Sequence, residues 1–165
     1  MIQNELLDLI SRFADHPIPA LINRHIYLWV GEVNGLISQS PAKVFTILDL
    51  HSLCQALNKT PFGEEAARRE LSSAIENWIN KEFPSSRNQR ALLVTGLDLL
   101  YRYRLPMSIF MQLASENCMI VLAISPLDVN FRPAKIFPVA IHFSPYEILK
   151  YVATEIPEEA IVKEG

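Results

Sequence analysis

Polar residues follow four apolar runs of this sequence, each at the point where a run ends. Gly31–Gly35 follow HIYLWV, and Asp49 and His51 lie at the end of VFTILDL. Asp98 comes three residues after ALLVT, and Ser125 ends CMIVLAIS. Parallel α/β sheets bind ligands at the carboxyl ends of their strands. If the runs are strands, these residues are the candidates for chemistry.

The layout of these residues resembles that of an ATPase core. Such a core holds phosphates with a glycine loop that carries a Lys-Ser/Thr pair after the first strand. An acid after a later apolar strand organises the metal and water, and a polar residue at the end of the next strand senses the terminal phosphate. The candidate cofactor-binding residues are therefore Gly31, Asn34, Gly35, Asp98 and Ser125.

The phosphate loop is the part of this layout that the sequence lacks. Residues 31–40 keep two glycines but no Lys-Ser/Thr pair, and only the 13 residues from Gly31 to Lys43 separate the first two runs. Glu32 adds negative charge where a triphosphate needs positive charge. The usual metal-binding acid would fall on Thr95, three residues before Asp98. We predict no cofactor, with ATP and magnesium bound only if a rearranged loop is completed by oligomerisation.

Each candidate acid also has a structural interpretation, and the sequence favours it. Asp98 is either a remaining metal or water ligand or a turn residue that accepts backbone hydrogen bonds. Asp49 either forms an acid–base pair with His51 or caps a helix that begins near His51. No His, Cys or acidic cluster has metal-ligand spacing, and no GxSxG motif is present. We therefore predict no metal site and no catalytic residue.

Basic and aromatic residues are concentrated in the segment YRYR, residues 101–104. Arginine pairs with phosphates and tyrosine stacks on bases, so this segment is a candidate for DNA or partner binding. It is equally consistent with a solvated loop whose tyrosines pack on the core. In a third interpretation, an arginine of this segment binds the nucleotide of a neighbouring subunit. The candidate residues for DNA or partner binding are Arg87, Arg90, Arg102 and Arg104.

The elements that must position these residues follow from hydrophobic periodicity and from Pro and Gly positions. Continuous apolar strands that alternate with helices are typical of a parallel sheet with helices on both faces. The predicted fold class is α/β, a single-domain three-layer sandwich with a mainly parallel five-stranded sheet. We predict helices at about 2–14, 51–57, 61–81, 106–117 and 144–153, and strands at 25–30, 44–50, 91–95, 118–125 and 137–143.

Composition and the chain ends set the broad class. The 165 residues are 50% hydrophobic and carry a net charge of −3, which gives no global reason for nucleic-acid binding. Cys54 and Cys118 lie in apolar surroundings and are predicted to be buried, reduced thiols. No basic leader or membrane-length apolar run is visible, so we expect a cytoplasmic protein with no membrane partner. The domain should span residues 1–154, followed by a partly mobile acidic tail, 155–165.

Several of these runs resemble a known family. VFTILDL, followed by a helix and then LLVTGLDLLYRYRLPMSIFMQLASENCMIVLAIS, is similar in order and wording to the small P-loop protein F family of BREX phage-defence systems. In that family an acidic pair at a strand end lies next to two leucines and an aromatic residue, as in LDLLY here. The resemblance covers roughly residues 25–150, and the family's phosphate loop would fall on residues 31–40, where it is absent.

The resemblance implies a degenerate P-loop NTPase-like protein, kept as a non-catalytic component of a prokaryotic defence or DNA-transaction complex. Its expected partners are protein subunits of that complex, with DNA or further copies of itself as other candidates. Two alternatives stay open. One is an active ATPase whose rearranged loop is completed by a second subunit through Arg102 or Arg104. The other is a DNA-binding module that uses the four candidate arginines.

Overall fold

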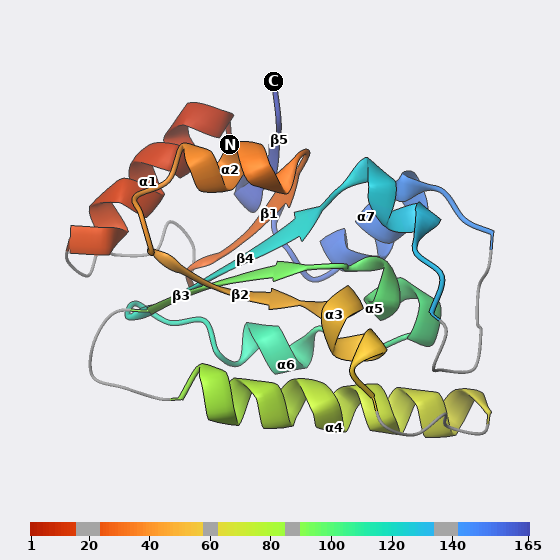
Figure 1. The fold of residues 1–165 in the computed structure, drawn as a ribbon. Helices are drawn as coiled ribbons and strands as arrows, with labels where there is room; N and C mark the ends of the chain where they lie inside the picture. Colours follow the sequence, from red (N-terminus) through yellow and green to blue (C-terminus); the bar gives the residue numbers. More distant parts are fainter. Residues whose placement is uncertain (16–23, 58–62, 85–89, 134–141) are drawn as a thin grey trace.

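Five parallel strands form one sheet in a computed structural model that describes residues 1–15, 24–57, 63–84, 90–133 and 142–165 (Figure 1). The strand order is β2-β3-β4-β1-β5, and every pair is parallel. The predicted α/β class is confirmed, and the sheet is wholly rather than mainly parallel. The strands are β1 Ile26–Val30, β2 Phe45–Asp49, β3 Arg90–Thr95, β4 Cys118–Ile124 and β5 Ile161–Lys163.

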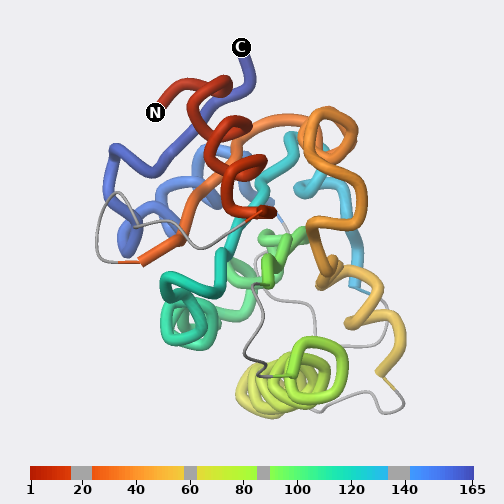
Figure 2. Tube along the Cα trace, turned by 90° about the vertical axis from the view of Figure 1, so that its left-hand side faces the viewer, coloured from red at the N-terminus to blue at the C-terminus, as the bar shows by residue number. Residues whose placement is uncertain are grey.

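Helices cover both faces of the sheet, which makes three layers. Figure 1 shows α1 (Gln3–Asp15) and α2 (Val33–Ser38) above the sheet, with α4 (Glu64–Glu82) and α6 (Ser108–Met111) below it. The turned view of Figure 2 shows the same separation of α1 from α4, and it places the two chain ends near each other. The remaining helices are α3 Leu50–Gln55, α5 Asp98–Tyr103 and α7 Pro145–Ala153, with 3₁₀ turns η1 Pro126–Asn130 and η2 Glu158–Ala160.

The core lies on both faces of the central strands. All seven residues of β4 are buried, and so are Tyr27, Leu28 and Trp29 of β1. Strands buried on both faces read as continuous apolar runs, which is why the sequence predicted them correctly. The two long helices bury one stripe each at helical spacing. These stripes are Leu6, Leu9, Ile10 and Phe13 of α1, and Ala67, Leu71, Ile75 and Ile79 of α4.

Several parts of the chain differ from the prediction. Residues 33–38 and 98–103 lie outside the predicted helices but form α2 and α5, and the helix expected at 106–117 is only the four-residue α6. The strand expected at 137–143 falls largely outside the described residues. The tail contributes instead to the sheet, because β5 pairs with β1 and Val162 is fully buried. Three residues are too few to show a strand period, so β5 could not be predicted from the sequence.

The register of the sheet brings the carboxyl ends of its strands to one edge. Asp49 at the end of β2 is aligned with Thr95 at the end of β3. Val30 at the end of β1 is likewise aligned with Ile124 at the end of β4. Residues that follow these strands therefore meet in space although they are far apart in sequence. This edge carries the candidate site.

Candidate functional site

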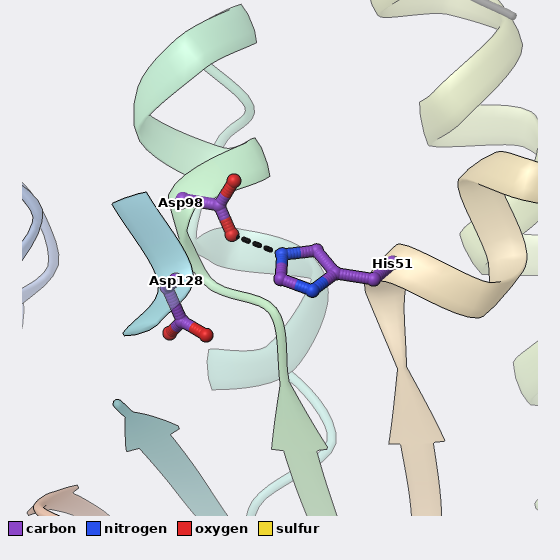
Figure 3. Close-up of side chains that lie close together, drawn as sticks. All are labelled: His51, Asp98 and Asp128. Atoms are coloured by element: carbon purple, nitrogen blue, oxygen red, sulfur yellow. Dashed lines mark hydrogen bonds and ion pairs between the residues drawn. The ribbon is translucent and has the colours of Figure 1, made fainter. Parts of the chain in front are cut away.

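Three side chains from three consecutive strand ends converge at the carboxyl edge of the sheet. His51 follows β2, Asp98 begins α5 after β3, and Asp128 lies in η1 after β4. Figure 3 shows the three side chains gathered above the strand ends, with the His51 ring directed at Asp98. One ligand-type atom from each residue lies within 4.8 Å of the other two. We call these residues the strand-end cluster.

Asp98 is fully buried, and both of its oxygens have partners. Oδ1 forms a hydrogen-bonded ion pair with Nε2 of His51. Oδ2 accepts from Nε of Arg102 at 2.8 Å, an (i, i+4) contact on α5. Arg102 is 1% exposed and its Nη2 also donates to the carbonyl oxygen of Phe131 at 2.6 Å. A buried carboxylate requires such pairing, because burying an isolated charge is very costly.

His51 is held by its ring as well as by its polar atoms. The imidazole stacks on Phe131 with ring centroids 3.8 Å apart and an angle of 5° between the planes. Burial by itself lowers the pKa of His51, but the hydrogen bond and charge of Asp98, with the charges of Asp128 and Asp49, raise that pKa above its ordinary value. The cluster therefore favours a positive charge at this position.

Gly96 makes the close approach of His51 possible. Its φ is +77°, and a Cβ there would lie 2.9 Å from both the backbone nitrogen and Cδ2 of His51. Asp49 fixes the same turn, since its Oδ1 accepts from His51 N at 3.1 Å and from Thr95 Oγ1 at 3.1 Å. Asp49 is thus the helix cap that the sequence favoured. It does not form an acid–base pair with the imidazole of His51 in this arrangement.

Ser125 and Asp128 form a capping box at the start of η1. Ser125 Oγ accepts from Leu127 N at 3.2 Å, and Ser125 N donates to Asp128 Oδ2 at 3.0 Å. Asp128 is 7% exposed, and burial raises its pKa to about 6, against the lowering effect of the Ser125 hydrogen bond. The sequence identified this segment as a turn or cap but did not connect Asp128 with Asp98.

The loop after β1 contains the predicted Gly31, Asn34 and Gly35, and the Glu164 side chain fills it. Glu32 N donates to Glu164 Oε1 at 3.1 Å. A Cβ on Gly31 would lie 2.5 Å from Cβ of Glu164, and one on Gly35 would lie 2.8 Å from Glu164 Oε2. Asn34 is exposed on α2. Nothing in the sequence marks Glu164 as part of this loop, because β5 places it there.

These residues do not fit ATP. The glycines that would admit a phosphate enclose a carboxylate, and residues 31–40 contain no lysine or arginine to offset a triphosphate. Glu32 lies in the same loop and adds a second negative charge. An anion is stabilised at a helix start by positive charge and free N–H groups, and here Glu164 takes the N–H of Glu32.

The three candidate arginines within the described residues do not gather on one surface. Arg87 lies outside the described residues, and Arg102 is buried against Asp98. Arg90 is at the amino end of β3, where its Nη1 donates to the carbonyl oxygen of Phe83 at 2.7 Å. Arg104 is exposed and lies over the Tyr101 ring at 4.5 Å. Arg90 and Arg102 are thus at opposite ends of the sheet, and Arg102 is enclosed by its own chain.

The cysteines and the lengths of the helices bear on two further predictions. Cys54 and Cys118 are both buried thiols, as predicted. None of the helices within the described residues has both the length and the apolar character of a membrane span. Comparison of the chain with protein-family models, with curated proteins and with solved structures gave no match.

Proposed function

We propose that this chain is a non-catalytic component with an ATPase-like α/β core, which acts by binding a protein partner in a larger assembly. The observation that carries the proposal is the Glu164 carboxylate, which lies against Gly31 and Gly35 and accepts from Glu32 N. It takes the place that a phosphate would need in an ATPase. A chain whose own carboxylate fills this space does not use the space to bind a nucleotide phosphate.

The sheet supports the ATPase-like part of the proposal. In the order β2-β3-β4-β1-β5, the strand that would carry a phosphate loop lies beside the strand that ends at Ser125. The strand before Asp98 lies one position further along. A loop, a sensor position and an acid thus lie along one edge of the sheet, which supports an ATPase-like core. Asp98 is engaged with Arg102 and His51, which supports loss of the catalytic use of this edge.

The setting of the proposed assembly rests on the resemblance of LDLLY and the following helix and strand to the BREX protein family. It favours a prokaryotic phage-defence or DNA-transaction complex. Protein binding is favoured over direct DNA binding because Arg102 and Arg90 are engaged within the chain, and because the net charge is −3. DNA affinity depends mainly on lysines and arginines that are free to neutralise phosphates.

An apolar groove beside β5 is the surface on which we place the partner. It has a volume of about 870 Å³ and runs between α1, α7 and the edge strand β5, with Ile2, Tyr146, Leu149 and Ile161 in its lining. Ile2 is 62% exposed and Tyr146 is 67% exposed. β5 is the last strand of the sheet order, and no strand of the described residues pairs with its outer side. This combination suits an extended apolar segment that adds to the sheet edge.

A binding experiment with matched surface variants tests this role. The chain is co-purified with proteins encoded by neighbouring genes, and the affinity of any complex is measured by calorimetry. Tyr146→Ala should weaken the complex at least tenfold, whereas Leu127→Ala should not, although Leu127 is 71% exposed. Self-association that Tyr146→Ala abolishes would identify a second copy as the partner. A complex equally stable in both variants would contradict the assignment of the groove.

A further inference from the structure

The strand-end cluster carries more negative charge than its neighbours offset. The carboxylates of Asp49, Asp98 and Asp128 all act on His51. Arg102 offsets one of them through its 2.8 Å contact with Asp98. Even with a protonated His51, three carboxylates face two positive groups, so a net negative charge remains at this partly buried edge, and such a site attracts a cation.

Asp128 has one carboxylate oxygen that accepts no hydrogen bond within the described residues. Its Oδ2 accepts from Ser125 N, while among the described residues no donor reaches Oδ1. The residue is 7% exposed, and burial disfavours its charged form. Figure 3 shows the Asp128 carboxylate below that of Asp98, on the same side of the His51 ring. A carboxylate oxygen that accepts no hydrogen bond, close to an imidazole, provides ligand types that zinc and manganese bind.

We propose that His51, Asp98 and Asp128 bind a divalent transition-metal ion of the zinc or manganese class, without any nucleotide. The three ligand atoms lie within 4.8 Å of one another. Metal bonds to imidazole nitrogen and carboxylate oxygen are about 2.0–2.2 Å long, so modest side-chain shifts are enough to enclose an ion. An imidazole with two carboxylates favours zinc, manganese or iron over magnesium and calcium, which prefer oxygen ligands throughout.

The neighbouring contacts would hold these ligands in place. Arg102 binds the second oxygen of Asp98 and orients the carboxylate. Phe131 stacks on the imidazole and fixes the plane of its ring. On metal binding, Nε2 of His51 loses its proton to solvent and gives up its hydrogen bond to Asp98, and the lone pair freed in this way binds the ion. Such supporting residues commonly change metal affinity 10- to 100-fold when they are lost. The ion would join the ends of β2, β3 and β4.

The test is a calorimetric titration of chelator-treated full-length chain with Zn²⁺ and with Mn²⁺, using Mg²⁺ as the control ion. We expect one saturable site for Zn²⁺ or Mn²⁺, weaker binding of Mg²⁺, and a rise in Tm with the bound ion. His51→Ala and Asp128→Asn should each weaken binding at least tenfold. His142→Ala is the matched control, because His142 is exposed and is not part of the cluster.

A spectroscopic readout keeps the test independent of how well the variants fold. In wild-type chain, the imidazole ¹⁵N resonances of His51 should shift on addition of one equivalent of Zn²⁺, and those of His142 should not. Absence of saturable binding by the wild-type chain, or equal loss of affinity in His142→Ala and His51→Ala, would overturn the proposal. Either result leaves the proposed partner-binding function unaffected, because that function rests on Glu164 and the β5 groove.

Discussion

Asp98 is central to the carboxyl edge of the sheet, because it is fully buried and pairs with side chains of two different helices. The sequence placed it near a metal-binding position but favoured a turn residue, and the structure shows a buried carboxylate between a guanidinium and an imidazole. Its pairing with Arg102 was accessible from the sequence, because residues four apart face each other on a helix. Its pairing with His51, 47 residues away, was not, because that contact requires knowledge of which strands are neighbours.

Replacing Asp98 by Asn should destabilise the fold by about 3–5 kcal/mol, because Arg102 would keep a buried charge without its counter-ion. The measurement is the free energy of unfolding from urea denaturation. The control is Asp8→Asn, which removes an exposed (i, i+4) pair with Arg12 and should cost less than about 1 kcal/mol. Equal costs for the two variants would show that Asp98 is not held as a buried charge.

Tyr103 offers a second prediction at this scale. Its hydroxyl is the one buried side-chain polar atom within the described residues that lacks a hydrogen-bond partner, and its ring is fully buried. Tyr103→Phe should therefore leave the free energy of unfolding unchanged or raise it by about 1–2 kcal/mol. Tyr151→Phe is the matched control, because the Tyr151 hydroxyl donates to the carbonyl oxygen of Leu105 at 2.8 Å. A loss of stability greater in Tyr103→Phe than in Tyr151→Phe would contradict this account.

At the scale of elements, length decided what could be predicted. The apolar residues of β1 and β4 form uninterrupted runs, and those of α1 and α4 recur at helical spacing. Both signals are clear in the sequence. The six-residue α2 and the three-residue β5 are too short to show either signal. The capping box of α7 can be recognised from Ser144 and Glu147 alone, because the motif depends on only two residues, three positions apart. The loop after β1 could not be interpreted fully without β5, which delivers Glu164 to it.

The turn between β3 and α5 yields an element-scale prediction. Gly96 and Gly63 both have positive φ, +77° and +91°, but a Cβ meets His51 only at Gly96, with nothing within 4 Å at Gly63. Gly63→Ala should cost roughly 1–2 kcal/mol from backbone conformation alone. Gly96→Ala should cost at least about 1 kcal/mol more, because the turn must move away from His51. Urea denaturation of the two variants measures the difference, and equal costs would refute the close approach of His51.

At the scale of the whole molecule, the α/β class and the parallel sheet followed from strands that are apolar throughout and alternate with helices. The strand order did not follow, and it decides which residues share the carboxyl edge. The sequence therefore supplied Asp98, Ser125 and the glycines after β1 as separate candidates. The fold separates them into a polar cluster at the ends of β2, β3 and β4 and a loop after β1 that Glu164 fills.

The central claim is that this edge no longer binds nucleotide, and a calorimetric titration of the full-length chain with Mg-ATP tests it most directly. We predict no saturable binding up to millimolar ATP, either for the wild-type chain or for Glu164→Gln. Even without the Glu164 carboxylate, residues 31–40 contain no lysine or arginine that could bind a triphosphate. Magnesium-dependent, saturable binding of ATP by the wild-type chain at micromolar concentrations would contradict the account.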